Sequence, residues 1–155
     1  MPSTVKPIPD GFHGATPYLC CRDAARAIEF YTRAFGATEV MRLAEPSGRI
    51  GHAEFRIGEA IVMLSDEYPD FGAISPQSLG GSAVAIHVYV PDVDALVSRA
   101  KAAGATVSRG PTDEFYGDRS ATLVDPYGHR WMFATHMEDV APEELGKRYA
   151  AMMKK

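Results

Sequence analysis

The stretch DAARAIEFYTRAFG, residues 23–36, decides the fold because its pattern returns once further along the chain. Asp23 is a candidate helix N-cap and Gly36 a candidate C-terminal stop. The apolar positions between them recur at helical spacing and predict a helix. An offset of 69 residues carries Asp23 onto Asp92, which starts a second predicted helix over residues 92–103. The sequence therefore predicts an internal repeat.

Short extended runs surround both helices. In the first half they are predicted at residues 14–21, 37–44, 50–57 and 60–66, around a helix at 23–35. In the second half they are predicted at residues 82–90, 105–108, 119–125 and 130–136. The order of elements predicts an α+β protein made of two tandem β-α-β-β-β modules, each about 70 residues long with its connections.

This organisation divides the chain into five predicted segments. They are a flexible arm (1–12), a first module (13–67), a linker rich in turn formers (68–81), a second module (82–137) and a C-terminal helix (138–155), which starts near Pro142.

Composition narrows the class of protein. The chain has 155 residues, of which 46% are hydrophobic and 23% charged, so it is long and apolar enough for a packed core. The net charge of -4 argues against a nucleic-acid partner. No apolar run approaches the length of a membrane span, and the N-terminal residues lack the apolar core of a signal peptide. A cytoplasmic location is expected.

Alternation along the strands separates two faces of the predicted sheet. The mostly aliphatic face expected to pack under the helices contains Ala15, Pro17, Leu19, Cys21, Val62, Leu64, Val84, Ile86, Val88, Val90, Trp131 and Phe133. The opposite face is more polar and contains Thr16, Tyr18, Cys20, Met63, Ala85, His87, Tyr89 and Met132. A face that mixes tyrosine, histidine, methionine and threonine is typical of a ligand cleft.

Four motifs add a resemblance to a known family. They are Arg22-Asp23 with the helix that ends at Phe35-Gly36-Ala37, the run from His87 to Asp94, Tyr116-Gly117-Asp118-Arg119, and Asp125-Pro126-Tyr127-Gly128-His129-Arg130-Trp131. In order and spacing they resemble the vicinal oxygen chelate superfamily, which comprises glyoxalases, bleomycin-resistance proteins and dioxygenases. The last two resemble the PhnB-like branch. The resemblance implies an incurved eight-stranded mixed sheet and a homodimer.

The resemblance also implies where a metal would be bound. Metal-binding members of the family hold a divalent ion with one His, Glu or Gln side chain from the first and the last strand of each module. Counting from the motifs places these positions at Thr16, Met63, Ala85 and Met132. None has the carboxylate or imidazole that such a metal requires, so no metal cofactor is expected. A relocated set of His52, Glu54 and His87 is the fallback.

The candidate ligand-binding residues are Thr16, Tyr18, Met63, Ala85, His87, Tyr89, Phe115, Tyr116, Arg119 and Met132. The aromatic rings would form walls for a planar ligand, and the methionines an adaptable floor. His87 is either a general base or a structural histidine. Arg119 either binds an anionic group or sits in a structural ion pair. Cys20 is either a small buried side chain or a covalent nucleophile.

These features predict a metal-independent protein that binds a small, partly aromatic organic molecule, with drug sequestration as its function. The alternative is a lyase or isomerase that uses His87 with Glu54 or Arg119 as its acid–base set, either metal-free or with a relocated metal. A third possibility is a structural or regulatory dimer whose cleft is filled by its own side chains.

Overall fold

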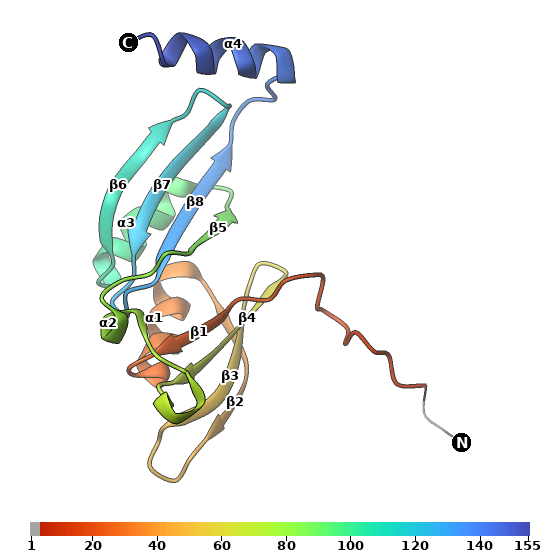
Figure 1. The fold of residues 1–155 in the computed structure, drawn as a ribbon, viewed down its shortest axis with the longest axis vertical. Coiled ribbons are helices and arrows are strands. Elements are labelled where there is room, and N and C mark those ends of the chain that lie inside the picture. Colours follow the sequence, from red (N-terminus) through yellow and green to blue (C-terminus); the bar gives the residue numbers. More distant parts are fainter. Residues whose placement is uncertain (1–3) are drawn as a thin grey trace. The chain divides into compact units, whose positions relative to one another are not determined.

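The protein folds as two compact units, which divide between Leu79 and Gly80 (Figure 1). The computed structural model describes residues 4–155. Each unit contains one four-stranded mixed sheet and a helix that follows its first strand. The α+β class and the tandem β-α-β-β-β repeat predicted from the sequence are confirmed.

The first unit contains β1 (Tyr18–Cys21), α1 (Ala24–Phe35), β2 (Thr38–Ala44), β3 (Ile50–Ile57) and β4 (Ala60–Asp66). Its strand order is β1-β4-β3-β2, with β1 parallel to β4 and the other pairs antiparallel. The parallel pair follows from topology, because the crossover through α1 and the β2–β3 hairpin returns the chain beside its first strand.

The second unit contains β5 (Ala85–Tyr89), α3 (Val93–Ala103), β6 (Thr106–Asp113), β7 (Asp118–Val124), β8 (Arg130–His136) and α4 (Pro142–Met152). Its strand order, β5-β8-β7-β6, repeats that of the first unit, and β5 runs parallel to β8. The predicted C-terminal helix is present as α4.

Both module helices start and end as their sequences predict. The side chains of Asp23 and Asp92 each accept a hydrogen bond from the backbone N–H three residues further on. Gly36 and Gly104 end the helices in the left-handed region, with φ values of 67° and 116°. A residue with a Cβ atom is strained in that conformation, so glycine suits both positions.

The core of the first unit is built on aromatic side chains under α1. The ring of Tyr31 stacks on Phe55 with centroids 4.8 Å apart, and on Phe35 at 5.6 Å. In the second unit, Trp131 and Phe133 stack at 6.0 Å. Of the residues predicted to face the helices, six are buried: Leu19, Cys21, Val62, Leu64, Trp131 and Phe133. The prediction is wrong for Ala15 and Val84, which are exposed because both precede the first strand of their unit. Burying each large apolar side chain contributes about 1.5–3 kcal/mol.

Two strands, β1 and β6, differ clearly from their predicted bounds. β1 begins at Tyr18 rather than at residue 14, because Pro17 has no N–H and joins the sheet only through its carbonyl, which accepts from Met63 N at 2.9 Å. β6 is longer than predicted and carries two register shifts between Val107 and Thr112. These irregularities interrupt the alternation that marks a strand in a sequence.

The predicted arm and the predicted linker differ in their secondary structure. Residues 4–12 form no helix or strand, and residues 1–3 of the predicted arm lie outside the described part of the chain. The predicted linker contains a 3-10 turn, η1 (Pro69–Phe71), and a short helix, α2 (Pro76–Leu79). Within residues 4–155, no helix combines the length and apolar character needed to cross a membrane.

Candidate functional site

A row of side chains crosses the sheet of the first unit on the face away from the core. The register places Tyr18 of β1 beside Met63 of β4, and Met63 beside Glu54 of β3. The Tyr18 hydroxyl reaches past β4 and lies 2.8 Å from Nδ1 of His52 on β3. Nε2 of His52 lies 3.1 Å from a carboxylate oxygen of Glu54. The sheet therefore joins a phenol, an imidazole and a carboxylate in one hydrogen-bonded chain.

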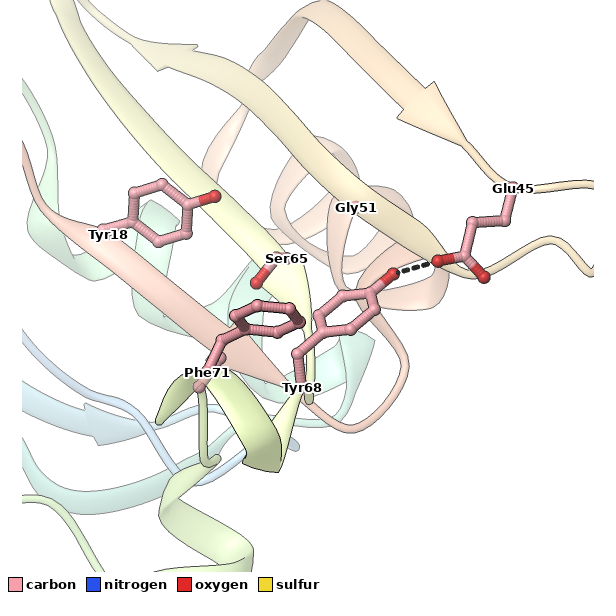
Figure 2. Close-up of a pocket in the computed structure, with 7 residues that line it drawn as sticks. Tyr18, Glu45, Gly51, Ser65, Tyr68 and Phe71 are labelled. Atoms are coloured by element: carbon pink, nitrogen blue, oxygen red, sulfur yellow. Dashed lines mark hydrogen bonds between the residues drawn. The ribbon is translucent and has the colours of Figure 1, made fainter.

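A pocket of about 420 Å³ lies beside this chain, within the first unit (Figure 2). It is lined by Tyr18, Glu45, Gly51, Ser65, Tyr68, Phe71 and Ala73. We call it the Phe71 pocket. Phe71 is 89% exposed and Tyr18 is 55% exposed, so both rings are available to a ligand.

The back of the Phe71 pocket is organised around Tyr68. Its hydroxyl donates to Glu45 at 2.8 Å, a bond drawn in Figure 2, and this hydrogen bond raises the pKa of Tyr68. The guanidinium of Arg49 sits 4.3 Å from the centre of the Tyr68 ring. Both contacts hold the phenol ring in place, so the pocket wall is preformed.

The carboxylate of Glu67 fixes the loop that carries Phe71. Glu67 accepts hydrogen bonds from the backbone N–H of Ser75 and from the Ser78 hydroxyl. Hydrogen bonds from Ser75 and Ser78 lower the pKa of Glu67 to about 2. The segment between β4 and α2 is therefore a fixed part of the site rather than a loose connection.

The second unit carries a related row with different chemistry. His87 of β5 lies beside Met132 of β8, and its ring contacts that of Tyr89 at 4.8 Å. The Tyr89 hydroxyl donates to the buried Asp118 at 2.7 Å, which raises the pKa of Tyr89. His136 lies 2.7 Å from Asp118 through Nδ1.

Two carboxylates flank His136. Its Nε2 lies 2.7 Å from Asp139, and the hydrogen bonds to Asp139 and Asp118 raise the pKa of His136. Burial alone would raise the pKa of Asp118, but hydrogen bonds from Tyr89 and His136 outweigh it and lower that pKa. Asp118 thus stays an acceptor at the centre of this cluster.

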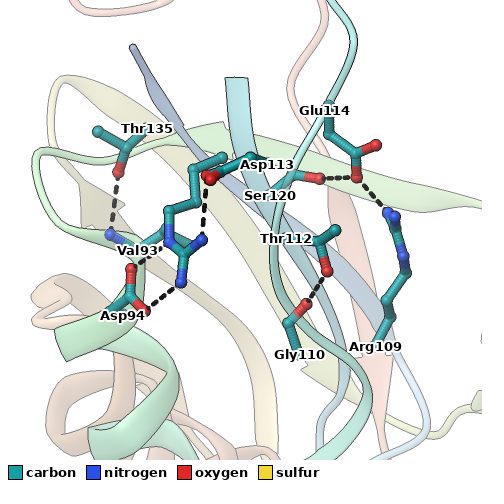
Figure 3. Close-up of polar contacts among 10 residues, drawn as sticks. Val93, Asp94, Arg109, Gly110, Thr112, Asp113, Glu114, Ser120 and Thr135 are labelled. Carbon is teal, nitrogen blue, oxygen red and sulfur yellow. Dashed lines mark hydrogen bonds and ion pairs between the residues drawn. The ribbon is translucent and has the colours of Figure 1, made fainter. Parts of the chain in front are cut away.

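Arg119, a candidate for binding an anionic ligand group, is engaged within its own unit. It donates two hydrogen bonds to Asp94, at 2.7 and 2.9 Å, and one to Asp113 at 3.0 Å. These bonds raise the pKa of Arg119. Figure 3 shows its two partners, Asp94 and Asp113, among the polar contacts of the second unit. Of the two roles that the sequence allowed for Arg119, this arrangement favours the structural ion pair over the binding of an anionic ligand.

Phe115 and Tyr116 line a second pocket, of about 530 Å³, against α4. Its other lining residues are Pro142, Leu145, Gly146 and Tyr149. Phe115 contacts the rings of Tyr116 and Tyr149 at 5.2 and 5.6 Å. These two aromatic candidates therefore belong to a hollow between a loop and a helix of the second unit.

A comparison with protein families places the repeat in a known superfamily. Residues 13–133 match the model of the Glyoxalase/Bleomycin resistance protein/Dioxygenase superfamily. The chain belongs to this superfamily. The resemblance carried by the four sequence motifs is thereby confirmed.

Sequence relatives and solved structures similar to this chain cover most of its length. An uncharacterized protein of Mycobacterium bovis is 42% identical over 133 residues, covering 84% of this chain and 88% of its own. The crystal structure of TioX from Micromonospora sp. ML1 is 29% identical and covers 80% of this chain and 100% of its own, with a TM-score of 0.64. A PhnB protein from Bacillus cereus, titled a putative 3-demethylubiquinone-9 3-methyltransferase, shares the fold at 19% identity, with a TM-score of 0.62 over 79% of this chain and 99% of its own.

The superfamily's implied metal can be compared with the donors present. The register pairs Tyr18 with Met63 and His87 with Met132, whereas Thr16 precedes β1 and Ala85 lies beside Arg130. These paired positions offer a phenol and a thioether in the first unit and an imidazole and a thioether in the second; only the imidazole is a usual ligand of a borderline divalent ion, and one such ligand is too few to hold it. Within residues 4–155 no group of three or more His, Cys, Asp or Glu side chains is arranged to hold a metal. The absence of a metal cofactor stays a prediction.

The fallback metal set and the predicted acid–base pair of His87 with Glu54 are divided between the two units, whereas His87 and Arg119 both belong to the second unit. His52 and Glu54 lie together on β3 of the first unit, and His87 lies on β5 of the second. Glu54 forms its hydrogen bond with His52, in the same unit, rather than with His87.

Sequence reasoning found Tyr18 but missed most of the Phe71 pocket. The missed residues are Glu45, Gly51, Ser65, Tyr68, Phe71 and Ala73. The strand parity that Ser65 shares with Met63 places it on the predicted cleft face, but Ser65 was not chosen as a candidate ligand-binding residue. Tyr68 and Phe71 lie in a segment rich in turn formers that was predicted as a linker, where two aromatic residues in four positions were the overlooked signal.

Cys20, next to Ser65 in the register, has the chemistry of a structural thiol. Burial, followed by the negative charges of Glu67 and Asp66, raises the pKa of Cys20 to about 11. A thiol that keeps its proton at neutral pH is a poor nucleophile. This environment disfavours the nucleophile interpretation, although Cys20 is only partly buried, whereas Cys21 is buried as predicted.

Proposed function

We propose that this superfamily member binds a small, partly aromatic organic molecule in the Phe71 pocket. The observation that carries the proposal is a ring kept 89% exposed at the mouth of a hollow of about 420 Å³. An exposed aromatic ring costs hydration free energy that ligand binding recovers. The pocket is large enough for a compact drug-sized ligand.

The polar groups of the pocket define the ligand further. The lining includes a carboxylate, Glu45, and the hydroxyl of Ser65, both of which accept hydrogen bonds. Glu45 disfavours an anionic ligand, as does the net charge of -4. The favoured ligand is therefore neutral or cationic, with one planar ring and at least one hydrogen-bond donor.

Sequestration is the proposed mode of action, as expected from the sequence. It requires only stoichiometric binding and release of an unchanged molecule, and it needs no metal. The donor set described above supports this metal-free form. Metal analysis of protein purified without an affinity tag, with thermal shifts against divalent ions, tests it; near-stoichiometric metal would contradict it.

A thermal-shift screen with planar aromatic amines tests binding, with the matching aromatic carboxylates as the comparison set. Phe71→Ala is expected to weaken the best amine about tenfold, equivalent to ~1.4 kcal/mol. Leu79→Ala is the control, because Leu79 is also an exposed apolar side chain of the first unit but does not line the pocket. A proposal of binding at this pocket fails if no compound stabilises the protein or if both variants weaken binding equally.

A lyase or isomerase function is the second candidate. The pairing of His87 with Arg119 loses support, because Arg119 is committed to Asp94 and Asp113. A different acid–base group supports this candidate: the hydrogen-bonded chain of Tyr18, His52 and Glu54. Mass spectrometry of the ligand recovered after incubation separates the two functions, since sequestration returns it unchanged.

Assembly and location are proposed on the family resemblance and the sequence alone. We infer a cytoplasmic homodimer. Size-exclusion chromatography with light scattering tests the dimer, and a monomeric mass at micromolar concentration would contradict it.

A further inference from the structure

The chain of Tyr18, His52 and Glu54 has a geometry that a purely structural contact would not need. Tyr18 lies on β1 and His52 on β3, with β4 between them. Two strand spacings amount to about 10 Å, so only a long side chain can bridge them. The bridge ends on a ring nitrogen of His52 rather than on water, although the Tyr18 side chain is largely exposed.

The acceptor at the end of this hydrogen-bonded series, Glu54, determines where the protons lie. A carboxylate only accepts hydrogen bonds, so Nε2 of His52 carries the proton that faces Glu54. In the neutral imidazole, Nδ1 is then an acceptor, and the Tyr18 hydroxyl donates to it. The phenol therefore donates to a base whose protonated form a carboxylate stabilises.

The Phe71 pocket supplies a place for a reacting molecule. Tyr18 both lines that pocket and forms the open end of the chain, whereas the side chains of His52 and Glu54 are less exposed. Figure 2 draws Tyr18 at the side of the pocket, across from Phe71 and Tyr68. A ligand seated against these rings would contact Tyr18, and His52 would act only through Tyr18.

The second unit shows the opposite arrangement and serves as an internal contrast. Tyr89 is as exposed as Tyr18, but its hydroxyl donates directly to the buried carboxylate of Asp118. No imidazole separates the two groups, and the pKa of Tyr89 is raised. Tyr89 is therefore held in its protonated form.

We propose that Tyr18 is an acid–base group that exchanges a proton with a weakly acidic O–H or N–H of the molecule bound in the Phe71 pocket. The ligand proton passes to the phenol oxygen as the phenol proton passes to Nδ1 of His52. The ligand gains a negative charge and His52 a positive one, which Glu54 balances. The reverse transfer restores all three groups. This proposal rests on the Phe71 pocket as the binding site.

Labelling with benzenesulfonyl fluoride tests the proposal without knowledge of the natural ligand. The phenol oxygen forms a bond to sulfur, the S–F bond breaks, fluoride leaves, and His52 takes the phenol proton. Peptide mass spectrometry gives the rate at each tyrosine. Tyr149 is the matched reference, because it is 51% exposed against 55% for Tyr18. Tyr18 is expected to react at least about tenfold faster than Tyr149, and Tyr89 more slowly than Tyr149.

The positioning roles of His52 and Glu54 are tested by His52→Gln and Glu54→Gln. Both should slow labelling at Tyr18 and leave Tyr149 unchanged. The dependence of the Tyr18 labelling rate on pH should differ between the native protein and His52→Gln, because only the native protein holds a base against the phenol oxygen. A merely structural role for His52 would not move this profile.

Two results would overturn the proposal: equal labelling of Tyr18 and Tyr149, or an unchanged Tyr18 profile in both glutamine variants that retain the native circular dichroism spectrum. Failure of the binding site gives a different result. If no amine protects Tyr18 from labelling but its rate still depends on His52, the acid–base group stands and the ligand proposal fails. If an amine binds and protects Tyr18 from labelling, but the labelling rate of Tyr18 does not depend on His52, the ligand pocket is supported and the acid–base proposal is wrong.

Discussion

Asp66 and Thr135 occupy equivalent positions at the ends of β4 and β8, and each accepts a hydrogen bond from the first backbone N–H of its module's helix. The distances are 3.1 Å to Ala24 N and 2.9 Å to Val93 N. Each helix therefore has two acceptors at its N-terminus, the capping aspartate and a residue from the last strand. The repeat thus conserves a contact between strand and helix while changing the residue that makes it.

Replacing Asp66 should cost more stability than replacing Thr135. Asp66 also accepts from Ile50 N at 2.6 Å, so Asp66→Ala leaves two buried donors without their carboxylate partner. Thr135→Val removes the partner of one donor, Val93 N, and of the Val90 carbonyl, both at part-buried contacts that water can reach more easily. We expect losses of about 3 and about 1 kcal/mol, respectively. Urea denaturation followed by circular dichroism measures both. Equal losses would show that the carboxylate contributes no more than a hydroxyl.

Glu67 should make the protein's stability depend on pH in the acid range. Its folded-state pKa of about 2 lies below the unfolded value of 4.5, because Ser75 and Ser78 hydrogen-bond to the carboxylate. This contribution is present above about pH 4.5 and is lost as the pH falls toward 2. Glu67→Gln should therefore be less stable than the native protein at pH 7 and nearly equal to it at pH 2.5. A stability difference that stays constant from pH 7 to 2.5 would contradict the lowered pKa.

His136 should have the opposite pH dependence. Hydrogen bonds to Asp139 and Asp118 raise its pKa above 6.5, so its contribution is complete below that pH and is lost as the pH rises through the folded-state value. His136→Gln should reduce the thermal midpoint at pH 5.5 and change it little at pH 9. NMR titration of the His136 ring gives the pKa directly, and a value at or below 6.5 would rule out the two carboxylates as its cause.

Gly117 should tolerate no side chain. Its φ is 98°, and an added Cβ atom would lie 2.3 Å from the carbonyl oxygen of Glu138, which belongs to the segment that leads to α4. Gly117→Ala should cost well above ~1 kcal/mol, because a backbone clash adds to the left-handed strain. Gly48→Ala is the control, since its φ is 89° and nothing lies within 4 Å of the added atom. Similar thermal midpoints for the two variants would show that the segment after β8 moves aside without cost.

Cys20 should react slowly with iodoacetamide at pH 7.5. Burial raises its pKa to about 11, so only a very small fraction is thiolate at that pH. Its alkylation rate, followed by peptide mass spectrometry, should keep increasing up to pH 10. A rate that levels off below pH 9 would indicate an activated thiol and restore the covalent alternative.

Local patterns in the chain were sufficient for the fold. The helix spacing between Asp23 and Gly36, its recurrence from Asp92, and strand alternation depend on neighbours a few residues apart, so they can be recognised without coordinates. They correctly assigned the two module helices, the C-terminal helix and the eight strands, and the motifs identified the superfamily. They missed α2, and they placed the exposed Val84 on the buried face. Strand ends were less predictable where Pro17 or a register shift interrupts the alternation.

The candidate site depended on contacts between residues distant in sequence. Tyr18 meets His52 across an intervening strand, and Phe71 reaches the pocket because Glu67 holds the segment after β4. The sequence left open whether Arg119 binds an anionic ligand or forms a structural ion pair, and the fold pairs it because α3 brings Asp94 within 2.7 Å of it. Such partners are chosen by strand register and loop path, which no local pattern encodes. For this protein the periodicity of the chain specified the scaffold, and packing between distant segments specified which side chains can act together.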